Sequence, residues 1–325
     1  MFKKFGVIVI LSFLVLGCKS NDFTIVKKSY INCEVKDYLG TSKEVIIPKR
    51  INLKKVISIG DSAFANKELT EATIPDSVKS IGNKAFESNS LKNVVIGNEV
   101  TNIGSNAFFA NDLKIIDIPN SVKSIGDSAF AFNQLGVIKI SESTISIGDS
   151  SFSNNLLTSI TIPDSVKSIG NKAFAFNCLS DVIIGNNVTS IGDSAFFCNR
   201  LKSITIPDSV TSIGDSAFGN FEKDDSSGFS NNNLTSIIIG NNVKSIGDYA
   251  FCDNELINLK IPNSVISIGD GAFSNNQLTN VVIPNSVKQI GNKAFSNNKN
   301  LTIYGTAGSA AETYAKENNI RFFAE

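Results

Sequence analysis

Six residues, Ile-Gly-Asp-Ser-Ala-Phe at 59–64, recur along the chain with the same order of apolar, glycine and polar positions. Ten further copies follow, each starting 22 residues after the previous one, except for one step of 33 residues between Ile213 and Ile246. A fixed period of about 20 to 50 residues indicates structural units that stack on one another. The pattern therefore predicts a solenoid, in which each unit buries its apolar face against its neighbours.

One unit shows which local structure each part of the repeat favours. Segment 157–162 is rich in β-branched residues and ends at Pro163, so it predicts a short strand. Copies of this strand in successive units would pair in parallel, about 4.8 Å apart. Gly170 allows a tight backbone turn, and the Asp or Asn that follows this Gly is expected to cap one helical turn carrying Ala173 and Phe174.

Two residue types form columns at fixed places in the repeat. Asn recurs two residues before the Leu that begins each strand, and Phe recurs at the end of every six-residue copy. We interpret the Asn residues as buried amides bonded to the backbone of their own and neighbouring units. A row of glycosylation or ligand sites is the alternative, but the rigid register favours the structural role. The Phe residues are expected to fill the core.

The repeat as a whole, Leu-x-x-Ile-x-Ile-Pro-x-Ser-Val-x-x-Ile-Gly-x-x-Ala-Phe-x-x-Asn, resembles the BspA-like leucine-rich repeat of bacterial surface proteins. The resemblance covers nearly the whole chain after residue 45. One unit departs from it, because residues 140–144 lack Pro and place Thr144 where Val is expected. The resemblance implies a leucine-rich repeat solenoid of 22-residue units, with a parallel β-sheet on the concave side and short helical turns on the other.

Proteins similar to this family are surface-exposed adhesins or ligand binders. The resemblance therefore implies a non-enzymatic surface protein that binds proteins of the host extracellular matrix or of another cell surface. A structural interaction module of the cell envelope without a host ligand is the second hypothesis. A parallel β-helix enzyme acting on polysaccharide is the third; it predicts three strands per coil and a cluster of carboxylates and basic groups, and the Phe column argues against it.

The N-terminus has the features of a targeting segment. Residues 1–17 contain two Lys and then an apolar run of about a dozen residues, shorter than the ~20 residues of a membrane span. Residues 15–18, Val-Leu-Gly-Cys, resemble a bacterial lipobox, in which the Cys receives a diacylglycerol. We expect lipid attachment at Cys18 and a membrane-anchored lipoprotein at the bacterial cell surface, in the outer membrane. An ordinary signal peptide with an incidental Cys is the alternative.

These features divide the chain into four parts: a lipoprotein signal peptide at 1–17, an anchor linker and N-terminal cap at 18–44, the repeat array at 45–304 and a C-terminal cap at 305–325. The end of a stack leaves an apolar face uncovered, so atypical terminal units are expected. Residues 308–319 predict a helix with Ser309 as its N-cap, and residues 320–323 predict a final strand.

The period is broken once, by eleven extra residues around 219–229. Insertions in solenoids lie in loops on one face, which is often the binding face. A contact or cation site is one hypothesis for this acidic loop, and a tolerated surface loop is the other, which we favour. The candidate residues are Phe221, Asp224, Asp225 and Phe229. Because the adjacent Asp pair lacks the spacing of a calcium loop, we assign no metal.

Composition narrows the chemistry further. Lys plus Arg and Asp plus Glu both number 30, so nucleic acid is not expected as the main partner, because phosphate binding needs a basic stripe. The absence of His removes His-based triads and the commonest metal ligand. We therefore assign no catalytic residue, no cofactor and no metal. The spacing leaves open whether Cys178, Cys198 and Cys252 form disulfides.

The strands offer an outward face at the positions two and four after the strand Leu. The column at the fourth position is mixed, uncharged overall and partly apolar, which suits a broad protein-binding surface better than a polysaccharide trough. The predicted binding residues are those of this column: Thr73, Val95, Asp117, Lys139, Thr161, Ile183, Thr205, Ile238, Lys260 and Val282.

Overall fold

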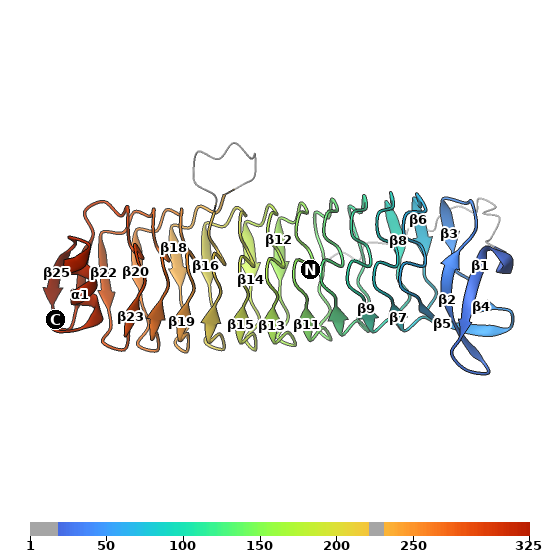
Figure 1. Cartoon of the computed structure of the whole chain (residues 1–325), viewed down its shortest axis with the longest axis horizontal. Coiled ribbons are helices and arrows are strands. Elements are labelled where there is room, and N and C mark those ends of the chain that lie inside the picture. The colour runs from blue at the N-terminus through green and yellow to red at the C-terminus, as the bar shows by residue number, and fades with distance from the viewer. Residues whose placement is uncertain (1–18, 221–230) are drawn as a thin grey trace, which may run out of the picture.

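The computed structural model describes residues 19–220 and 231–325, which wind into coils stacked along one axis (Figure 1). The N-terminal coils lie at one end of the stack and the C-terminal coils at the other, as the repeat period predicts. Lipid attachment at Cys18 and the proposed contacts of the insertion fall outside the described residues. The solenoid fold and its parallel strands are confirmed.

Each coil contributes to two ladders of parallel strands. The predicted three-residue strand, such as β12 (Ser159–Thr161), pairs with the same segment of a neighbouring coil, β14 (Asp181–Ile183). A second ladder, which the sequence analysis did not predict, consists of the dipeptide before each Gly, as in β13 (Ser168–Ile169). The dipeptide recurs in every coil, and its eleven copies join with three strands of the N-terminal end into one sheet of 14 strands.

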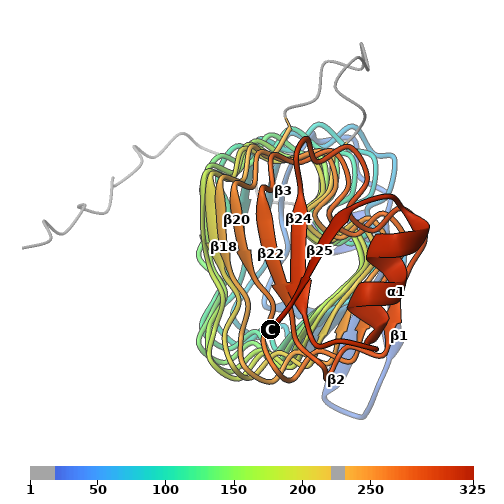
Figure 2. The same ribbon diagram turned by 90° about the vertical axis from the view of Figure 1, so that its left-hand side faces the viewer.

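The two ladders lie on different sides of the coil, as the view along the solenoid shows (Figure 2). The long sheet contains β1 (Phe23–Lys27), β2 (Asn32–Tyr38), β4 (Arg50–Ile51), β5 (Lys54–Ile59), β7 (Ser80–Ile81), β9 (Asn102–Ile103), β10 (Ser124–Ile125), β11 (Ser146–Ile147), β13, β15 (Ser190–Ile191), β17 (Ser212–Ile213), β19 (Ser245–Ile246), β21 (Ser267–Ile268) and β23 (Gln289–Ile290). The smaller sheets contain β3 (Glu44–Ile46), β6 (Glu71–Thr73), β8 (Asn93–Val95), β12, β14, β16 (Ser203–Thr205), β18 (Ser236–Ile238), β20 (Asn258–Lys260), β22 (Asn280–Ile283), β24 (Thr302–Gly305) and β25 (Arg321–Ala324).

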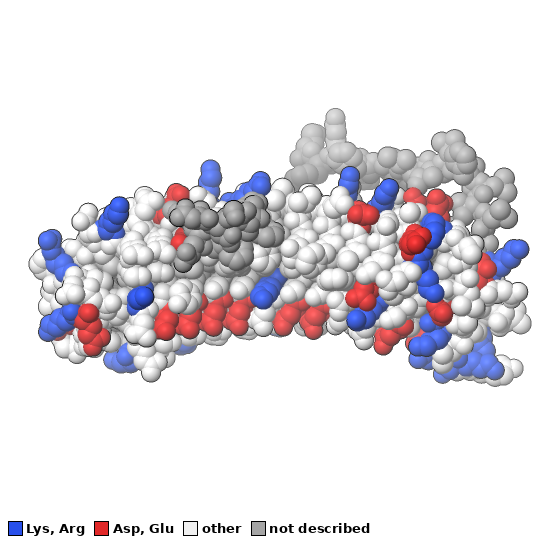
Figure 3. All heavy atoms as spheres, turned by 45° about the horizontal axis from the view of Figure 1, so that its top comes forward, with Lys and Arg blue, Asp and Glu red and all other residues white. Residues whose placement is uncertain are grey.

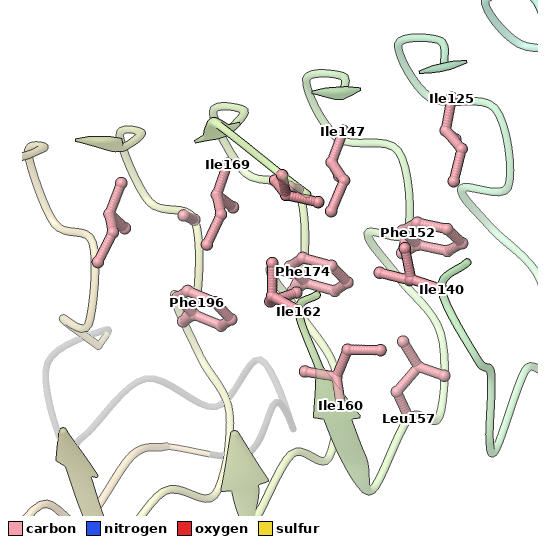
Figure 4. Close-up of a cluster of buried hydrophobic side chains, with 14 of the residues drawn as sticks. Ile125, Ile140, Ile147, Phe152, Leu157, Ile160, Ile162, Ile169, Phe174 and Phe196 are labelled. Atoms are coloured by element: carbon pink, nitrogen blue, oxygen red, sulfur yellow. The ribbon is translucent and has the colours of Figure 1, made fainter. Parts of the chain in front are cut away.

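The Phe column forms the centre of the core, as predicted. Its rings are buried and stack on one another, with centroids 4.8–5.5 Å apart and ring planes within 11° of parallel. Figure 4 shows Phe152, Phe174 and Phe196 in this stack, with Ile147 and Ile169 beside them. Because the ring spacing matches the spacing of paired strands, the rings and the two ladders fit the same coil rise.

The segment carrying Ala and Phe is a hydrogen-bonded turn, and the expected helical turn is absent from the described coils. The residue before this Ala has a left-handed backbone, and so does Ser150 with φ of 55°, which precedes Ser151 in the unit where Ser replaces Ala. This conformation interrupts a right-handed helix. The N–H of Ser150 donates to the carbonyl of Asn171 in the next coil, at 2.7 Å. Asp149 likewise accepts the N–H of Asn171 at 2.7 Å, so this carboxylate links coils and does not cap its own turn.

Glycine is required in this turn because neighbouring coils approach closely. A Cβ atom added at Gly170 would lie 2.6 Å from the backbone carbon of Gly148 and 2.7 Å from the nitrogen of Asp149. Neither atom can move without disturbing the preceding coil. The predicted turn at Gly170 is thus present, but its cause is the contact between coils.

The N-terminal end of the stack is closed by a hairpin. After the short 3₁₀ turn η1 (Ser20–Asp22), strands β1 and β2 pair antiparallel, and β2 pairs in parallel with β5. Tyr38 stacks on Phe64 with ring centroids 5.6 Å apart, and Phe23 meets the same ring edge-on at 6.3 Å. These two rings cover the open end of the Phe column.

The C-terminal end is covered by helix α1 (Ala310–Glu317) and strand β25. The ring of Tyr314 packs edge-on against Phe295, and its hydroxyl accepts the N–H of Phe295 at 2.9 Å. Ser309 occupies the N-cap position but makes no side-chain cap bond; Glu312 instead accepts the N–H of Gly308 at 2.6 Å. Over the residues that the structure describes, we find no helix with the length and apolar character of a membrane span.

Candidate interaction surface

The outward side chains of the three-residue strands form an exposed face, which we call the strand face. Of the ten predicted binding residues, nine are exposed and Thr73 is half-buried, so the expected outward orientation is confirmed. Their role in binding stays a prediction. Strand pairing brings eight of them together in pairs: Thr73 with Val95, Thr161 with Ile183, Thr205 with Ile238, and Lys260 with Val282.

Two further residues of the strand face were not on the predicted list. Ile115, which is 76% exposed, pairs in parallel with the exposed Val137 in the next coil. Both stand two positions after the strand Leu, where most units carry a polar residue. An aliphatic residue at that outward position was the available signal. With the exposed Val95 in the preceding coil, they form what we call the first apolar patch.

A hollow of about 550 Å³ lies beside the first apolar patch. Its lining residues are Lys92, Asn93, Asp112, Lys114, Ile115 and Gln134. The hollow thus combines an aliphatic side chain with lysines and a carboxylate. Protein interfaces have a similar composition, with an apolar centre and a polar rim.

A second apolar patch lies further along the strand face. Ile183 and Ile238 are both exposed and lie on either side of Thr205, in three successive coils. A hollow of about 430 Å³ adjoins this patch and is lined by residues that include Ile183, Thr205 and Asp208.

A different groove, of about 640 Å³, follows the Ser-Ile-Gly-Asp segments of four coils on the long sheet and the Gln-Ile-Gly segment of a fifth. Asp193, Asp215, Asp248 and Asp270 line it and form an acidic row, which is visible as a line of red side chains in Figure 3. Each of the first three accepts the backbone N–H of the next Asp in the row, at 2.7–2.9 Å. The row therefore holds coils together. No group of three or more metal-ligating side chains occurs within residues 19–220 and 231–325.

The ends of the insertion are fixed by buried amides. Asn220 donates to the carbonyl of Asn232 at 2.9 Å and accepts the N–H of Asn232 at 2.6 Å. Asn220 also donates to the carbonyl of Asp253 at 2.7 Å. Phe218 and Phe251 still stack with centroids 5.3 Å apart, so the insertion leaves the stack unbroken. The candidate residues Phe221, Asp224, Asp225 and Phe229 lie outside the described residues.

The thiols of the described chain are reduced: Cys33, Cys178, Cys198 and Cys252 form no disulfide. Burial raises the pKa of Cys252 to about 12, and burial also raises the pKa of Cys33. A thiol with such a pKa is protonated at neutral pH and is a poor nucleophile. These two residues therefore act as small core side chains.

The remaining pKa shifts belong to the two caps. A hydrogen bond from Lys316 and one from the Gly308 N–H lower the pKa of the Glu312 carboxyl, while burial raises the pKa of Tyr314. A hydrogen bond from Lys43 lowers the pKa of Glu68. Each shift follows from local packing or pairing near an end of the stack.

The repeat region matches the family described as the BspA type leucine rich repeat region. The matches cover residues 57–177, 101–224 and 222–306, in six copies, and together span more than half of the chain. No curated protein sequence matches the chain significantly.

Three solved structures are similar over most of the chain. A leucine-rich repeat protein from Bacteroides ovatus has a TM-score of 0.64 at 24% identity, covering 94% of this chain and 77% of that one. A leucine rich cell surface protein from Faecalibacterium prausnitzii has a TM-score of 0.52 at 26% identity, covering 88% and 75%. The pneumococcal vaccine antigen PcpA has a TM-score of 0.58 at 20% identity, covering 93% and 96%. At these identities the first and third show a shared fold only.

Proposed function

Because the chain belongs to the BspA-type leucine-rich repeat family, we propose that it is a non-enzymatic cell-surface protein that binds other proteins through its strand face. The observation that carries this proposal is the contrast between the two sides of each strand. Inward positions repeat the same residue type from coil to coil, whereas outward positions vary and include five aliphatic residues that are more than half exposed. Variation confined to the outer face is expected of a rigid scaffold that carries a specific binding surface.

Exposed aliphatic residues on this scaffold support binding of a protein. Large apolar patches are rare on the surfaces of soluble proteins and mark sites of interaction. Here they lie on strands or bridged segments that pair between coils, so their positions are set before any ligand arrives, and little conformational entropy is lost on binding. Lys92, Lys114 and Lys139 are exposed near the first patch and provide a polar rim.

The expected partners are proteins of the extracellular matrix or of another cell surface. The similar structure from Faecalibacterium prausnitzii is described as a cell surface protein, which supports an external location for this chain. We assign residues 1–17 as a signal peptide and Cys18 as the site of a lipid anchor in the outer membrane. An acyl anchor contributes ~0.8 kcal/mol for each buried methylene group.

A polysaccharide-acting β-helix has no support from the coil geometry. Such an enzyme would have three strand ladders per coil, whereas the described coils, 45–220 and 231–304, have two. A module of the cell envelope without a host ligand remains the alternative to adhesion, and it shares the same strand face.

Binding to immobilised matrix proteins and to intact cells tests the proposal. The paired variants Ile115→Ser with Val137→Ser, and Ile183→Ser with Ile238→Ser, each remove one apolar patch. Ile145→Ser with Ile266→Ser is a matched control, because both residues are exposed but lie outside the strand face.

We expect the native protein to bind at least one matrix protein or cell type, and one of the patch variants to lose more than tenfold in affinity while the control keeps it. Loss of a central interface residue commonly costs about 2 kcal/mol or more, which corresponds to this factor. If the native protein binds neither matrix proteins nor cells, adhesion is refuted and the envelope module is favoured. Proteolysis of intact cells provides an independent check, since an anchor facing inward would protect the chain.

A further inference from the structure

Two hairpin tips project from the N-terminal end of the solenoid. The first is the turn between β1 and β2, where Tyr30 is 94% exposed and Ile31 is also exposed. The second is the turn between β4 and β5, where Leu53 is 88% exposed. Large side chains this exposed are not needed to close the stack, since Phe23 and Tyr38 already cover the Phe column.

The two tips are joined into one surface. The Lys54 ammonium donates to the carbonyls of Ser29 and Tyr30, and it lies 5.5 Å from the centre of the Tyr30 ring. The N–H of Lys55 donates to the carbonyl of Ile31 at 2.8 Å. We call residues 27–31 and 49–55 together the cap tip.

The cap tip carries positive charge only. Its residues include six cations and no Asp or Glu: Lys27, Lys28, Lys49, Arg50, Lys54 and Lys55. One of these, Lys28, is paired with Glu34 at 2.9 Å, while Lys27, Lys49 and Arg50 are exposed. Figure 3 shows the resulting concentration of blue side chains at the N-terminal end of the molecule, at the lower right.

Charge is distributed unevenly over the whole chain, although the total is zero. Residues 19–59 contain nine Lys or Arg and four Asp or Glu, a net charge of +5. Residues 60–325 contain 19 Lys or Arg and 26 Asp or Glu, a net charge of −7. One end of the solenoid is therefore basic and the rest is acidic.

We propose that the cap tip docks on the surface of an anionic lipid bilayer, so that the solenoid stands on the membrane by its N-terminal end. Cations near a membrane are attracted to anionic headgroups, and a Tyr ring with adjacent aliphatic side chains suits the boundary between headgroups and acyl chains. The negative charge of residues 60–325 is repelled by the same headgroups, which keeps the array and its strand face away from the bilayer.

The place where the chain enters the fold supports this orientation. Regular structure begins close to Cys18 in the sequence, with η1 from Ser20 and β1 from Phe23. A lipid at Cys18 would hold this end of the solenoid at the membrane; only this part of the argument rests on the proposed anchor. Docking by the cap tip needs no protein ligand, so it is tested separately from binding by the strand face.

Sedimentation with vesicles tests the proposal on the chain that begins at residue 18, with Cys18→Ser to prevent acylation. This chain keeps every contact described above. We expect it to bind vesicles that contain phosphatidylglycerol and not vesicles of phosphatidylcholine alone, and we expect salt to weaken the binding. Lys27→Gln with Lys49→Gln should weaken it by about fivefold for each cation removed. The matched control is Lys167→Gln with Lys244→Gln, two exposed lysines of the array outside the strand face, which should bind vesicles as the parent chain does.

Insertion of the apolar residues is tested by fluorescence. The protein has no Trp, so Tyr30→Trp introduces a single reporter at the cap tip, and Phe323→Trp introduces one at the opposite end. We expect brominated phosphatidylglycerol vesicles to quench the Trp at position 30 and to leave the Trp at position 323 unchanged. Circular dichroism spectra identical to that of the parent chain would show that the variants are folded.

Equal vesicle binding by the Lys27 and Lys49 variant and its control would overturn the proposal, as would absence of quenching at position 30. Binding of soluble heparin as tight as binding of the vesicles, without quenching, would make the cap tip a polyanion site and would also overturn it. Vesicle binding that survives loss of both apolar patches would show that docking and ligand binding are separate properties.

Discussion

Replacement of one ladder Asn should test how the coils are held together. Asn177 is buried, and its amide donates to the carbonyls of Phe152, Phe174 and Ala175 at 2.9, 3.2 and 3.2 Å. Its oxygen accepts the N–H of Leu157 at 3.0 Å. The column of Asn residues was predicted to play this role, and the contacts confirm it.

The loss of unfolding free energy on removing the Asn177 amide depends on which of its backbone partners keep another hydrogen bond. In Asn177→Leu the Phe152 carbonyl keeps a bond from Asn155 at 3.2 Å, and the Phe174 carbonyl keeps one from Asn199 at 3.0 Å. The N–H of Leu157 has no substitute among the bonds described. A buried orphan N–H costs about 1–3 kcal/mol and each lost hydrogen bond about 1 kcal/mol. We expect the free energy of unfolding to fall by about 2–4 kcal/mol.

Asn177→Asp should be more damaging at neutral pH, although it has nearly the same shape. The carboxylate still accepts the Leu157 N–H, but it cannot donate, and it faces three carbonyl oxygens. Burial raises the pKa of this new carboxyl in the folded chain above its unfolded value. The loss of unfolding free energy is therefore largest at pH values above the pKa in the folded chain. It becomes smaller as the pH falls from that pKa toward the pKa in the unfolded chain.

Urea unfolding followed by circular dichroism measures both effects, with Asn187→Leu as control. Asn187 is exposed, and its side chain donates to the Asp164 carbonyl at 2.9 Å, so its replacement should change stability by less than about 0.5 kcal/mol. A loss below about 0.5 kcal/mol in Asn177→Leu would refute the account of the ladder. So would an Asn177→Asp deficit, measured against the native protein, that grows as pH is lowered from 7.

Three further outcomes are expected. Asp215→Asn should stabilise the fold by about 0.2–1 kcal/mol at low ionic strength, because the amide oxygen can still accept the next coil's N–H while repulsion along the acidic row falls. Thermal melts measure this gain, and a gain of the same size in concentrated salt would contradict the electrostatic reason. Iodoacetamide at pH 8 should label the half-buried Cys178 before Cys252, whose pKa of about 12 leaves little thiolate, and peptide mass spectrometry that found the reverse order would disprove it. Gly170→Ala should lower the free energy of unfolding in urea by about 1–3 kcal/mol, because its Cβ would meet rigid backbone. Gly136→Ala should not lower it, because no atom lies within 4 Å of the added Cβ. Equal losses in the two variants would argue against the close approach of coils.

Much of the fold was predictable from the chain because its determinants are local and repeated. The period of 22 residues, the Phe column and the Asn column each place the same side chain at the same point of every coil. Burial of that side chain in one coil implies its burial in the next. The terminal helix was predictable from its composition and lies close to the expected bounds.

The candidate site was predictable only in part. Outward orientation of the fourth-position column follows from the two-residue period of a strand, so Ile183 and Ile238 were found. Ile115 and Val137 were missed because their importance comes from pairing between coils, which a residue's place in its own repeat does not reveal. The cap tip was missed for a similar reason, since its two halves are separate in sequence and meet through Lys54 and Lys55.

The sequence by itself determined the solenoid, its core columns and its two capped ends, because a side chain repeated at one period must stack on its own copies. Tertiary structure alone decided the second strand ladder, the turn conformation and the role of the Asp row. A Ser-Ile dipeptide is too short to show a strand's alternation, and it becomes a strand only when another dipeptide lies beside it. Ser150 adopts its left-handed backbone, and Asp149 finds its donor, through bonds to the next coil. Contacts between coils have no signature within one repeat.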